Sequence, residues 1–328
     1  MTSEEKKESA VSIVMPLWNN SREVKRAIQG ILRQTHAHYE LLIVDDGSTD
    51  DSAAVVKSFT DGRIRFVQQK HTGVSAARNR GYREAHHDLI AFCDADDEWC
   101  PFFLETIVQL YLKYSGCSIF ATHYSYRGRD GTVRLPILRG VPRGAWEGIL
   151  DNYFSVAAKS DPPIWSSAVA VKKKALQSVG GFHEDVHSGE DLLLWATLAV
   201  RFHIAYTSKP SAIFWLRDEI AKPTKPPSNP DLVGDQLLAL LPAVDLHHRK
   251  YFLRYVSLWH RMRASTCLEF GLSSEALREV GIMFRCHPMD WHVLYYALLL
   301  LLPPKLRTQA ASMMLKIKKH LRSRIQAA

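Results

Sequence analysis

The chain has 328 residues, of which 46% are hydrophobic and 23% are charged, and its formal net charge is +8. This length and hydrophobic content favour one large globular domain with an appendage and exclude a mainly disordered chain. The five cysteines form no Cys-x-x-Cys pair and are odd in number, which argues against a disulfide framework or a zinc site.

The positive charge is concentrated in the last third of the chain. Residues 1–230 carry 28 Lys and Arg against 27 Asp and Glu, whereas residues 231–328 carry 14 against 7. Such an excess favours an anionic partner. Residues 222–230 contain four prolines and predict a linker or a surface crossing. Residues 1–10 are polar, which predicts a disordered N-terminus and a cytosolic start.

The first part of the chain alternates between short apolar segments and amphipathic ones. The expected strands are residues 11–17, 39–44, 64–68 and 89–93. The expected helices are residues 21–34, 51–59, 74–85 and 101–114. This alternation predicts an α/β fold with a doubly wound, mainly parallel sheet.

Acidic side chains follow two of the expected strands. Asp45 and Asp46 follow residues 39–44, and Asp94, Asp96 and Asp97 follow residues 89–93. Because the carboxyl ends of parallel strands border the ligand crevice, we expect both groups to face one site. Crowded carboxylates become favourable when a hard cation such as Mg²⁺ or Mn²⁺ neutralises them. The alternative is a solvated acidic turn that caps the next helix.

The first expected strand is not followed by a glycine-rich phosphate loop. Neither G-x-G-x-x-G nor G-x-x-x-x-G-K-[ST] occurs there, which argues against a dinucleotide oxidoreductase or a P-loop phosphotransferase. The strand ends instead in Pro16, Leu17 and Trp18. Trp18 could hold a flat base or simply pack against its neighbours.

The last third of the chain has a helical apolar pattern. The expected helices are residues 231–241, 246–270 and 273–285, and residues 293–304 form an apolar run too short to cross a bilayer, which needs about 20 residues. From Lys305 onward there are seven Lys and Arg and no Asp or Glu. This pattern predicts a basic amphipathic helix on an anionic membrane surface. The alternative is a core helix on the catalytic domain followed by a solvated basic tail.

Five ordered blocks resemble the inverting family 2 glycosyltransferases, which have the GT-A fold. The blocks lie between Val11 and Arg217 and read VSIVMPLWN, ELLIVDDGSTDDS, GVSAARNRG, LIAFCDADDEWCP and GGFHEDVHSGEDLLLW. The resemblance implies a Rossmann-like GT-A catalytic domain over residues 11–221, followed by the linker 222–230 and the helical region 231–328. It also implies transfer of a sugar from a nucleoside diphosphate, with UDP favoured, to a glycan or lipid-linked acceptor. The expected product is a bacterial cell-surface polysaccharide or lipopolysaccharide, made in the cytoplasm at the inner face of the plasma membrane.

The same resemblance assigns roles to donor-side residues. Asp96 is implied as the ligand of Mn²⁺ or Mg²⁺, and Asp94 as a ligand of the metal or the ribose. Asp46 is implied in recognition of the base, with Asp45 beside it. Further donor-side positions are Pro16 and Arg78, and the alternative for Arg78 is a solvated arginine on a helix face.

Inversion in one displacement requires a base that takes the proton of the acceptor hydroxyl. By resemblance Asp191 is the candidate, with Glu190 beside it, in the first turn of an expected helix at residues 192–202. The helix dipole favours ionised carboxylates there, and this also explains acidic residues that have no catalytic role. Arg217 lacks the histidine that usually follows, so its role is open. Trp165 could stack on a sugar ring or pack within a loop.

Three other functions would each explain some of these sequence features. A nucleic-acid binder would explain the basic C-terminal region but not the acidic strand ends, so we expect no nucleic-acid partner. A nucleotide-sugar-binding protein without turnover and a metal-dependent nucleotide phosphohydrolase both remain alternatives. Analysis of the reaction products separates them.

Overall fold

The computed structural model describes residues 9–216, 225–303 and 306–307. Arg217 and nearly all of the basic stretch after Lys305 lie outside the described residues. The chain divides into two compact units, Met1–Asp218 and Glu219–Ala328, which are described separately.

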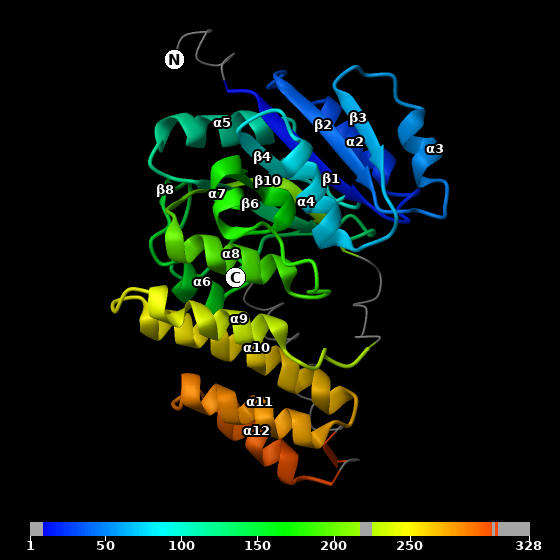
Figure 1. Cartoon of the computed structure of the whole chain (residues 1–328). Coiled ribbons are helices and arrows are strands. Elements are labelled where there is room, and N and C mark those ends of the chain that lie inside the picture. The colour runs from blue at the N-terminus through cyan, green and yellow to red at the C-terminus, as the bar shows by residue number, and fades with distance from the viewer. Residues whose placement is uncertain (1–8, 217–224, 304–305, 308–328) are drawn as a thin grey trace. The chain divides into compact units, whose positions relative to one another are not determined.

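The first unit is built on one ten-stranded sheet (Figure 1). Its strand order is β3-β2-β1-β4-β9-β6-β10-β5, with β7 paired to β6 and β8 to β10. The strands are β1 (Val11–Leu17), β2 (Tyr39–Asp45), β3 (Ile64–Gln68), β4 (Leu89–Phe92), β5 (Glu98–Trp99), β6 (Ile119–Arg127), β7 (Val133–Arg134), β8 (Glu147–Ile149), β9 (Val169–Lys172) and β10 (Ile204–Trp215).

Strands β3, β2, β1 and β4 pair in parallel, so their carboxyl ends meet at one edge of the sheet. Both β1 and β2 are buried along their whole length, as continuous apolar strands are when helices cover both faces. Leu17 lies opposite Asp45, and Val14 lies opposite Phe92. The two acidic segments therefore begin at the same edge.

Beyond β4 the sheet changes direction. Strand β9 pairs antiparallel with both β4 and β6, and β6 pairs in parallel with β10. The alternating pattern of the N-terminal part gave no indication of β9. Strand β10 is long, and its register with β6 shifts around Pro210.

Seven α-helices of the described part flank this sheet. They are α2 (Val24–Leu32), α3 (Ser52–Lys57), α4 (Val74–Glu84), α5 (Phe103–Lys113), α6 (Tyr153–Lys159), α7 (Lys173–Val179) and α8 (Glu190–Arg201). The main core packs α2 and α5 against one face of the sheet, through residues such as Ile28 and Phe103. On the other face α4 lies so close to β1 that a Cβ at Gly81 would come within 2.2 Å of Val14 Cγ1. Only glycine allows this approach.

The described part of the second unit is helical. Its α-helices are α9 (Leu232–Leu240), α10 (Arg249–Glu269), α11 (Ser273–Cys286) and α12 (Trp291–Leu301). A small apolar core joins α10, α11 and α12 through Ala264, Met283 and Leu299. Among the described residues, no helix is long and apolar enough to cross a membrane.

A buried charge network also holds this second unit together. Arg263 Nε donates to Glu279 Oε1 at 2.9 Å and lies 3.0 Å from Asp231 Oδ2, while His260 Nδ1 lies 2.6 Å from Glu279 Oε2. The Asp231, His260 and Glu279 atoms are close enough together to hold a metal ion. The Arg263 guanidinium already neutralises both carboxylates, so we interpret the network as an anchor that ties the first turn of α9 to α10 and α11.

Candidate active site

A pocket of about 250 Å³ lies at the carboxyl ends of β1, β2 and β4. It is lined by the end of β1, the loop after β2, the start of α4 and the turn after β4. Among its lining residues are five of the predicted positions, namely Pro16, Asp46, Arg78, Asp94 and Asp96. Each acidic group therefore contributes to one site, the first through Asp46 and the second through Asp94 and Asp96.

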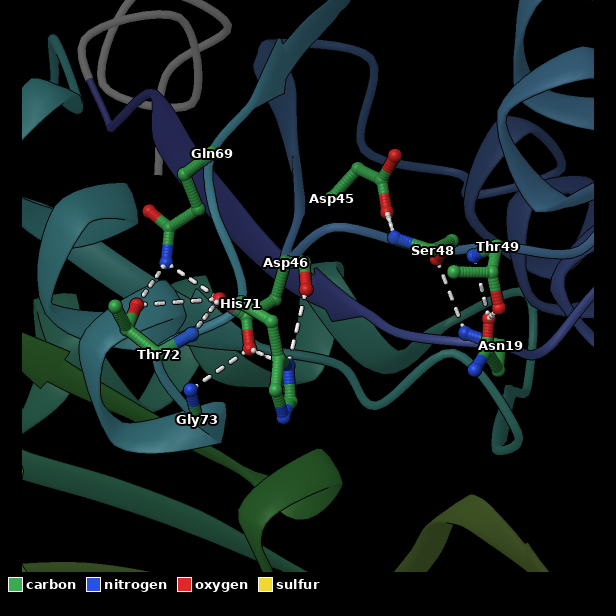
Figure 2. A network of polar contacts seen from close by, with 9 residues as sticks. All are labelled: Asn19, Asp45, Asp46, Ser48, Thr49, Gln69, His71, Thr72 and Gly73. Carbon is green, nitrogen blue, oxygen red and sulfur yellow. Dashed lines mark hydrogen bonds and ion pairs between the residues drawn. The ribbon is translucent and has the colours of Figure 1, made fainter.

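Asp46 holds the loop that leads into α4 (Figure 2). Its Oδ1 accepts hydrogen bonds from Gln69 Nε2 at 2.7 Å and from the Thr72 amide at 3.0 Å. Its Oδ2 accepts from the Gly73 amide at 2.8 Å and lies 2.8 Å from His71 Nδ1. Both oxygens of this carboxylate are thus occupied by the protein, and Asp46 fixes residues 69–73 beside the pocket.

Asp45 has a different position from the one predicted. It is fully buried and does not belong to the pocket lining formed by the described residues. Its Oδ1 accepts from the Ser48 amide at 3.0 Å, and its Oδ2 accepts from Gln68 Nε2 at 2.9 Å. The structure therefore makes Asp45 a support of the loop, because Ser48 and Gln68 occupy its two carboxylate oxygens.

The loops after β1 and β2 are joined to each other. Asn19 Oδ1 accepts from the Thr49 amide at 2.8 Å, and the Asn19 amide donates to Ser48 Oγ at 3.0 Å (Figure 2). Gly47 allows this turn, because it has φ +74° and an added Cβ would lie 2.9 Å from the His71 amide nitrogen.

Trp18 forms an aromatic wall of the pocket with His71. Their rings stack with centroids 4.6 Å apart and an interplanar angle of 18°. Trp18 is 50% exposed, so part of its surface remains open to solvent. This wall can receive a flat base by stacking. The sequence analysis did not identify His71, which gains meaning only from its contacts with Trp18 and Asp46.

Arg78 joins the acidic turn after β4 to the start of α8. Its Nη2 donates to Asp94 Oδ1 at 2.7 Å, and its Nη1 donates to Glu190 Oε1 at 3.1 Å. Burial alone would lower the pKa of Arg78, but the charges of Asp94 and Glu190 raise it above its usual value. Arg78 is only 4% exposed, which excludes the solvated helix-face alternative.

Asp191 lies in the first turn of α8, which begins at Glu190 after Gly189 in the left-handed conformation. Burial, together with the charges of Glu190 and Asp94, raises the pKa of Asp191 to about 6, and the charge of Arg78 opposes this shift. Glu190 and Asp191 do not line the pocket within the described chain, and Arg78 connects them to it.

The acidic turn after β4 is fixed to the segment before β9. The Asp94 amide donates to Ser167 Oγ at 2.9 Å, and Trp165 Nε1 donates to Asp97 Oδ2 at 3.0 Å. Asp97 is buried, and burial raises its pKa with the charges of Asp94 and Asp96 adding to the shift. The structure thus gives Asp97 a supporting role. Trp165 also packs against Phe214, with the two ring centroids 4.7 Å apart.

The carboxylates at this turn fit a hard divalent cation. Asp94 and Asp96 both line the pocket, and carboxylate oxygens are the ligands that Mg²⁺ and Mn²⁺ prefer. The charges of both residues act on Asp97, which indicates a local concentration of negative charge. Arg78 contacts Asp94 through Oδ1. Two observations support a cation here: both residues are carboxylates, and both line the pocket.

Asn79 of α4 is a structural residue beside the site that the sequence analysis did not identify. Its Nδ2 donates to the Phe182 carbonyl at 2.8 Å, and its Oδ1 accepts from the Phe182 amide at 2.8 Å. This pairing docks the segment before α8 onto α4. The sequence offered only an amide side chain directly after Arg78.

The comparisons with known proteins agree with this architecture. The model of the family described as "Glycosyl transferase family 2" matches residues 12–176. The chain belongs to glycosyl transferase family 2. The match includes β1, α4 and the acidic turn and ends before α8, so it does not itself cover Asp191.

Curated relatives of this family 2 chain come from several bacteria. An uncharacterized glycosyltransferase of Rickettsia felis is 30% identical over 204 residues, which is 62% of this chain and 32% of the relative. The Escherichia coli protein named UDP-Glc:alpha-D-GlcNAc-diphosphoundecaprenol beta-1,3-glucosyltransferase WfgD is 38% identical over 104 residues, 31% of this chain and 41% of that protein. The matched parts thus span well under two thirds of these relatives.

A solved structure shares the fold. The S. aureus protein TarS, residues 1–349 in complex with UDP-GlcNAc, superimposes with a TM-score of 0.65 at 16% identity. The alignment covers 84% of this chain and 81% of TarS. At this identity the likeness concerns the fold, and it confirms the predicted fold class of a GT-A sheet followed by a helical region.

Proposed function

We propose that the chain is a metal-dependent, inverting glycosyltransferase that moves a sugar from a UDP-sugar to a hydroxyl of a glycan or lipid-linked acceptor. Membership of family 2 supports glycosyl transfer. The single observation that carries the mechanism is the Arg78 bridge, because one guanidinium contacts Asp94 of the donor pocket and Glu190 beside Asp191.

On this proposal the donor lies along the pocket. Its base stacks on Trp18 and His71 beside the loop held by Asp46, and its diphosphate faces Asp94 and Asp96. Pro16 shapes the end of β1 beneath it. The choice of UDP rests on the names of the relatives, since WfgD is named for UDP-Glc and TarS was solved with UDP-GlcNAc. A bound Mn²⁺ or Mg²⁺ would neutralise the charge that develops on the diphosphate.

Asp191 is the proposed base. As the acceptor oxygen forms its bond to the anomeric carbon, the bond from that carbon to the diphosphate oxygen breaks, and the electron pair leaves with the nucleotide. The acceptor proton passes to Asp191. A pKa of about 6 keeps this carboxylate mainly ionised at neutral pH and makes it a stronger base than an ordinary aspartate. Glu190 and Arg78 orient the turn that carries it.

The proposed membrane partner concerns the C-terminal region. The basic stretch of residues 305–328 supports an anionic membrane surface as partner and a cytoplasmic place at the inner face of the plasma membrane. The boundaries of the catalytic domain, residues 11–221, and of the linker, residues 222–230, are also proposals. A cell-surface polysaccharide or lipopolysaccharide remains the proposed product.

The test compares the wild-type chain with Asp191→Asn on a panel of nucleotide sugars and saccharide acceptors. A general base contributes about 10²- to 10⁴-fold in rate, so transfer should fall by that factor while donor affinity stays nearly unchanged. Asp185→Asn is the control, because the Asp185 side chain lies in the same segment and is 85% exposed. Near-normal turnover by Asp191→Asn would overturn the assignment.

Product analysis in the same assay separates the rival functions. Free sugar or phosphate without a glycosylated acceptor would indicate hydrolysis of the donor. Donor binding without any product would indicate a nucleotide-sugar-binding protein.

A further inference from the structure

Helix α12 presents an apolar face to solvent. Its eleven residues, WHVLYYALLLL, include no Asp, Glu, Lys or Arg. Trp291, Leu294, Leu298 and Leu301 are 54%, 64%, 54% and 80% exposed. At about 100° per residue these four side chains lie within about 80° of the helix circumference. We call them the outer face of α12.

The opposite side of α12 is already used. Tyr296 and Leu299 are buried and pack with Val280 and Met283 of α11 in the small core of the second unit. Figure 1 shows α11 and α12 side by side. Packing of the unit therefore accounts for the buried side and leaves the outer face unexplained. A surface helix normally carries polar residues on that side.

The surroundings of α12 indicate the chemistry of a partner. The chain that follows, residues 305–328, contains seven Lys and Arg and no acidic residue. One of these, Arg307, donates to the carbonyls of Leu299, Leu300 and Leu302 and so places a cation at the end of α12. A face of apolar side chains beside a concentration of positive charge complements an anionic lipid surface.

Two other occupants agree less well with these observations. A membrane-spanning helix needs about 20 residues, and α12 has 11. A second copy of the chain would carry the same net charge of +8, and like charges repel each other.

We propose that the outer face of α12 inserts among the acyl chains of an anionic lipid surface, with the helix lying parallel to the membrane plane. The inference deepens the membrane partner proposed above for the C-terminal region and rests on it. It is independent of the donor chemistry. The docking surface lies on the structured second unit itself, and the basic stretch adds electrostatic attraction.

The test measures sedimentation of the full-length chain with phosphatidylcholine vesicles that contain phosphatidylglycerol, and with phosphatidylcholine vesicles alone. The variant is Leu294→Gln with Leu298→Gln and Leu301→Gln, all at exposed positions. Because each buried leucine contributes to binding, vesicle affinity should fall by at least about tenfold. The matched control is Leu135→Gln with Ile149→Gln and Leu246→Gln, three exposed apolar positions outside α12. It should bind as the wild type does.

Circular dichroism and thermal unfolding check that both triple variants are folded. Vesicle binding by the α12 variant at the wild-type level would overturn the proposal, and a deletion of residues 308–328 would then show that the basic stretch binds alone. Loss of self-association by the α12 variant in lipid-free sedimentation velocity, without a change in vesicle binding, would assign the face to a second copy. Donor affinity, measured in parallel, reports on the proposed enzymatic function separately.

Discussion

Arg78 Nη2 donates to Asp94 Oδ1 at 2.7 Å, and in this ion pair Arg78 is buried while Asp94 is partly exposed at the pocket. The same guanidinium reaches Glu190 in the first turn of α8. A single side chain on α4 therefore connects the acidic turn after β4 with the helix that carries the proposed base. A substitution that changes the charge of Asp94 or Arg78 should therefore change the electrostatic environment of Asp191.

Arg78→Met should destabilise the protein by about 3–5 kcal/mol, because it removes one partner from a buried ion pair and leaves Asp94 and Glu190 close together without a cation. Donor affinity and turnover should both fall. Arg83→Met is the control, since the Arg83 side chain is 57% exposed and pairs at the surface. Denaturant unfolding measures both variants. Equal losses for the two would contradict the bridging role.

The transfer rate should rise with pH through about 6 and level off above it. Burial raises the pKa of Asp191 to about 6, and only the ionised carboxylate can accept the acceptor proton. The pH profile of kcat/KM measures this. The residual activity of Asp191→Asn should lack the acidic limb, and an unchanged limb in that variant would assign it to another group.

The same pKa shift has the opposite sign for stability. Because the folded protein holds the proton of Asp191 more tightly than an ordinary aspartate with a pKa of 3.8, the contribution of this group declines as pH rises from about 4 to about 6. The free energy of unfolding of Asp191→Asn should lack this decline. Urea titrations at several pH values measure the difference.

Chelation of divalent cations should weaken donor binding. Asp94 and Asp96 then face the diphosphate without the charge of a bound divalent cation. In calorimetry, Mn²⁺ should increase the affinity of the wild-type chain for UDP and have little effect on Asp96→Asn. Asp88→Asn, at an exposed position, should respond as the wild type does. Equal donor affinity of the wild type with and without metal would refute the predicted metal dependence.

Gly47→Ala should cost about 1–2 kcal/mol and weaken donor binding. Its φ of +74° is unfavourable for alanine, and the new Cβ would lie 2.9 Å from the His71 amide nitrogen. The loop held by Asp46 would shift. Gly62→Ala is the control, because no atom lies within 4 Å of its added Cβ. Thermal unfolding and hydrogen exchange of residues 69–74 report the two effects.

Much of the donor side could be predicted from the sequence. Asp46, Asp94 and Asp96 stand directly after apolar segments, and the parallel part of the sheet brings such ends together. The placement of these residues could be predicted because each follows an apolar segment directly in the sequence. Glu190 and Asp191 were likewise expected in the first turn of a helix, and α8 begins at Glu190.

Other features depend on contacts between distant segments. Asn79 pairs with Phe182, 103 positions later, and no local pattern identifies that partner. The position of Asp45 outside the pocket lining depends on contacts such as the one with Gln68, 23 positions later. The antiparallel insertion of β9 depends on how the chain returns to β4 after a long excursion. Local sequence patterns therefore could not predict the order of the strands beyond β4.

Arg78 and Asn79 are consecutive residues of α4, yet they hold different parts of the chain. Arg78 contacts Asp94 and Glu190, and Asn79 contacts Phe182. A one-residue insertion or deletion within α4 would rotate the helix by about 100° and pull both side chains away from their partners at once. Homologues that retain this site should therefore vary in length only outside α4.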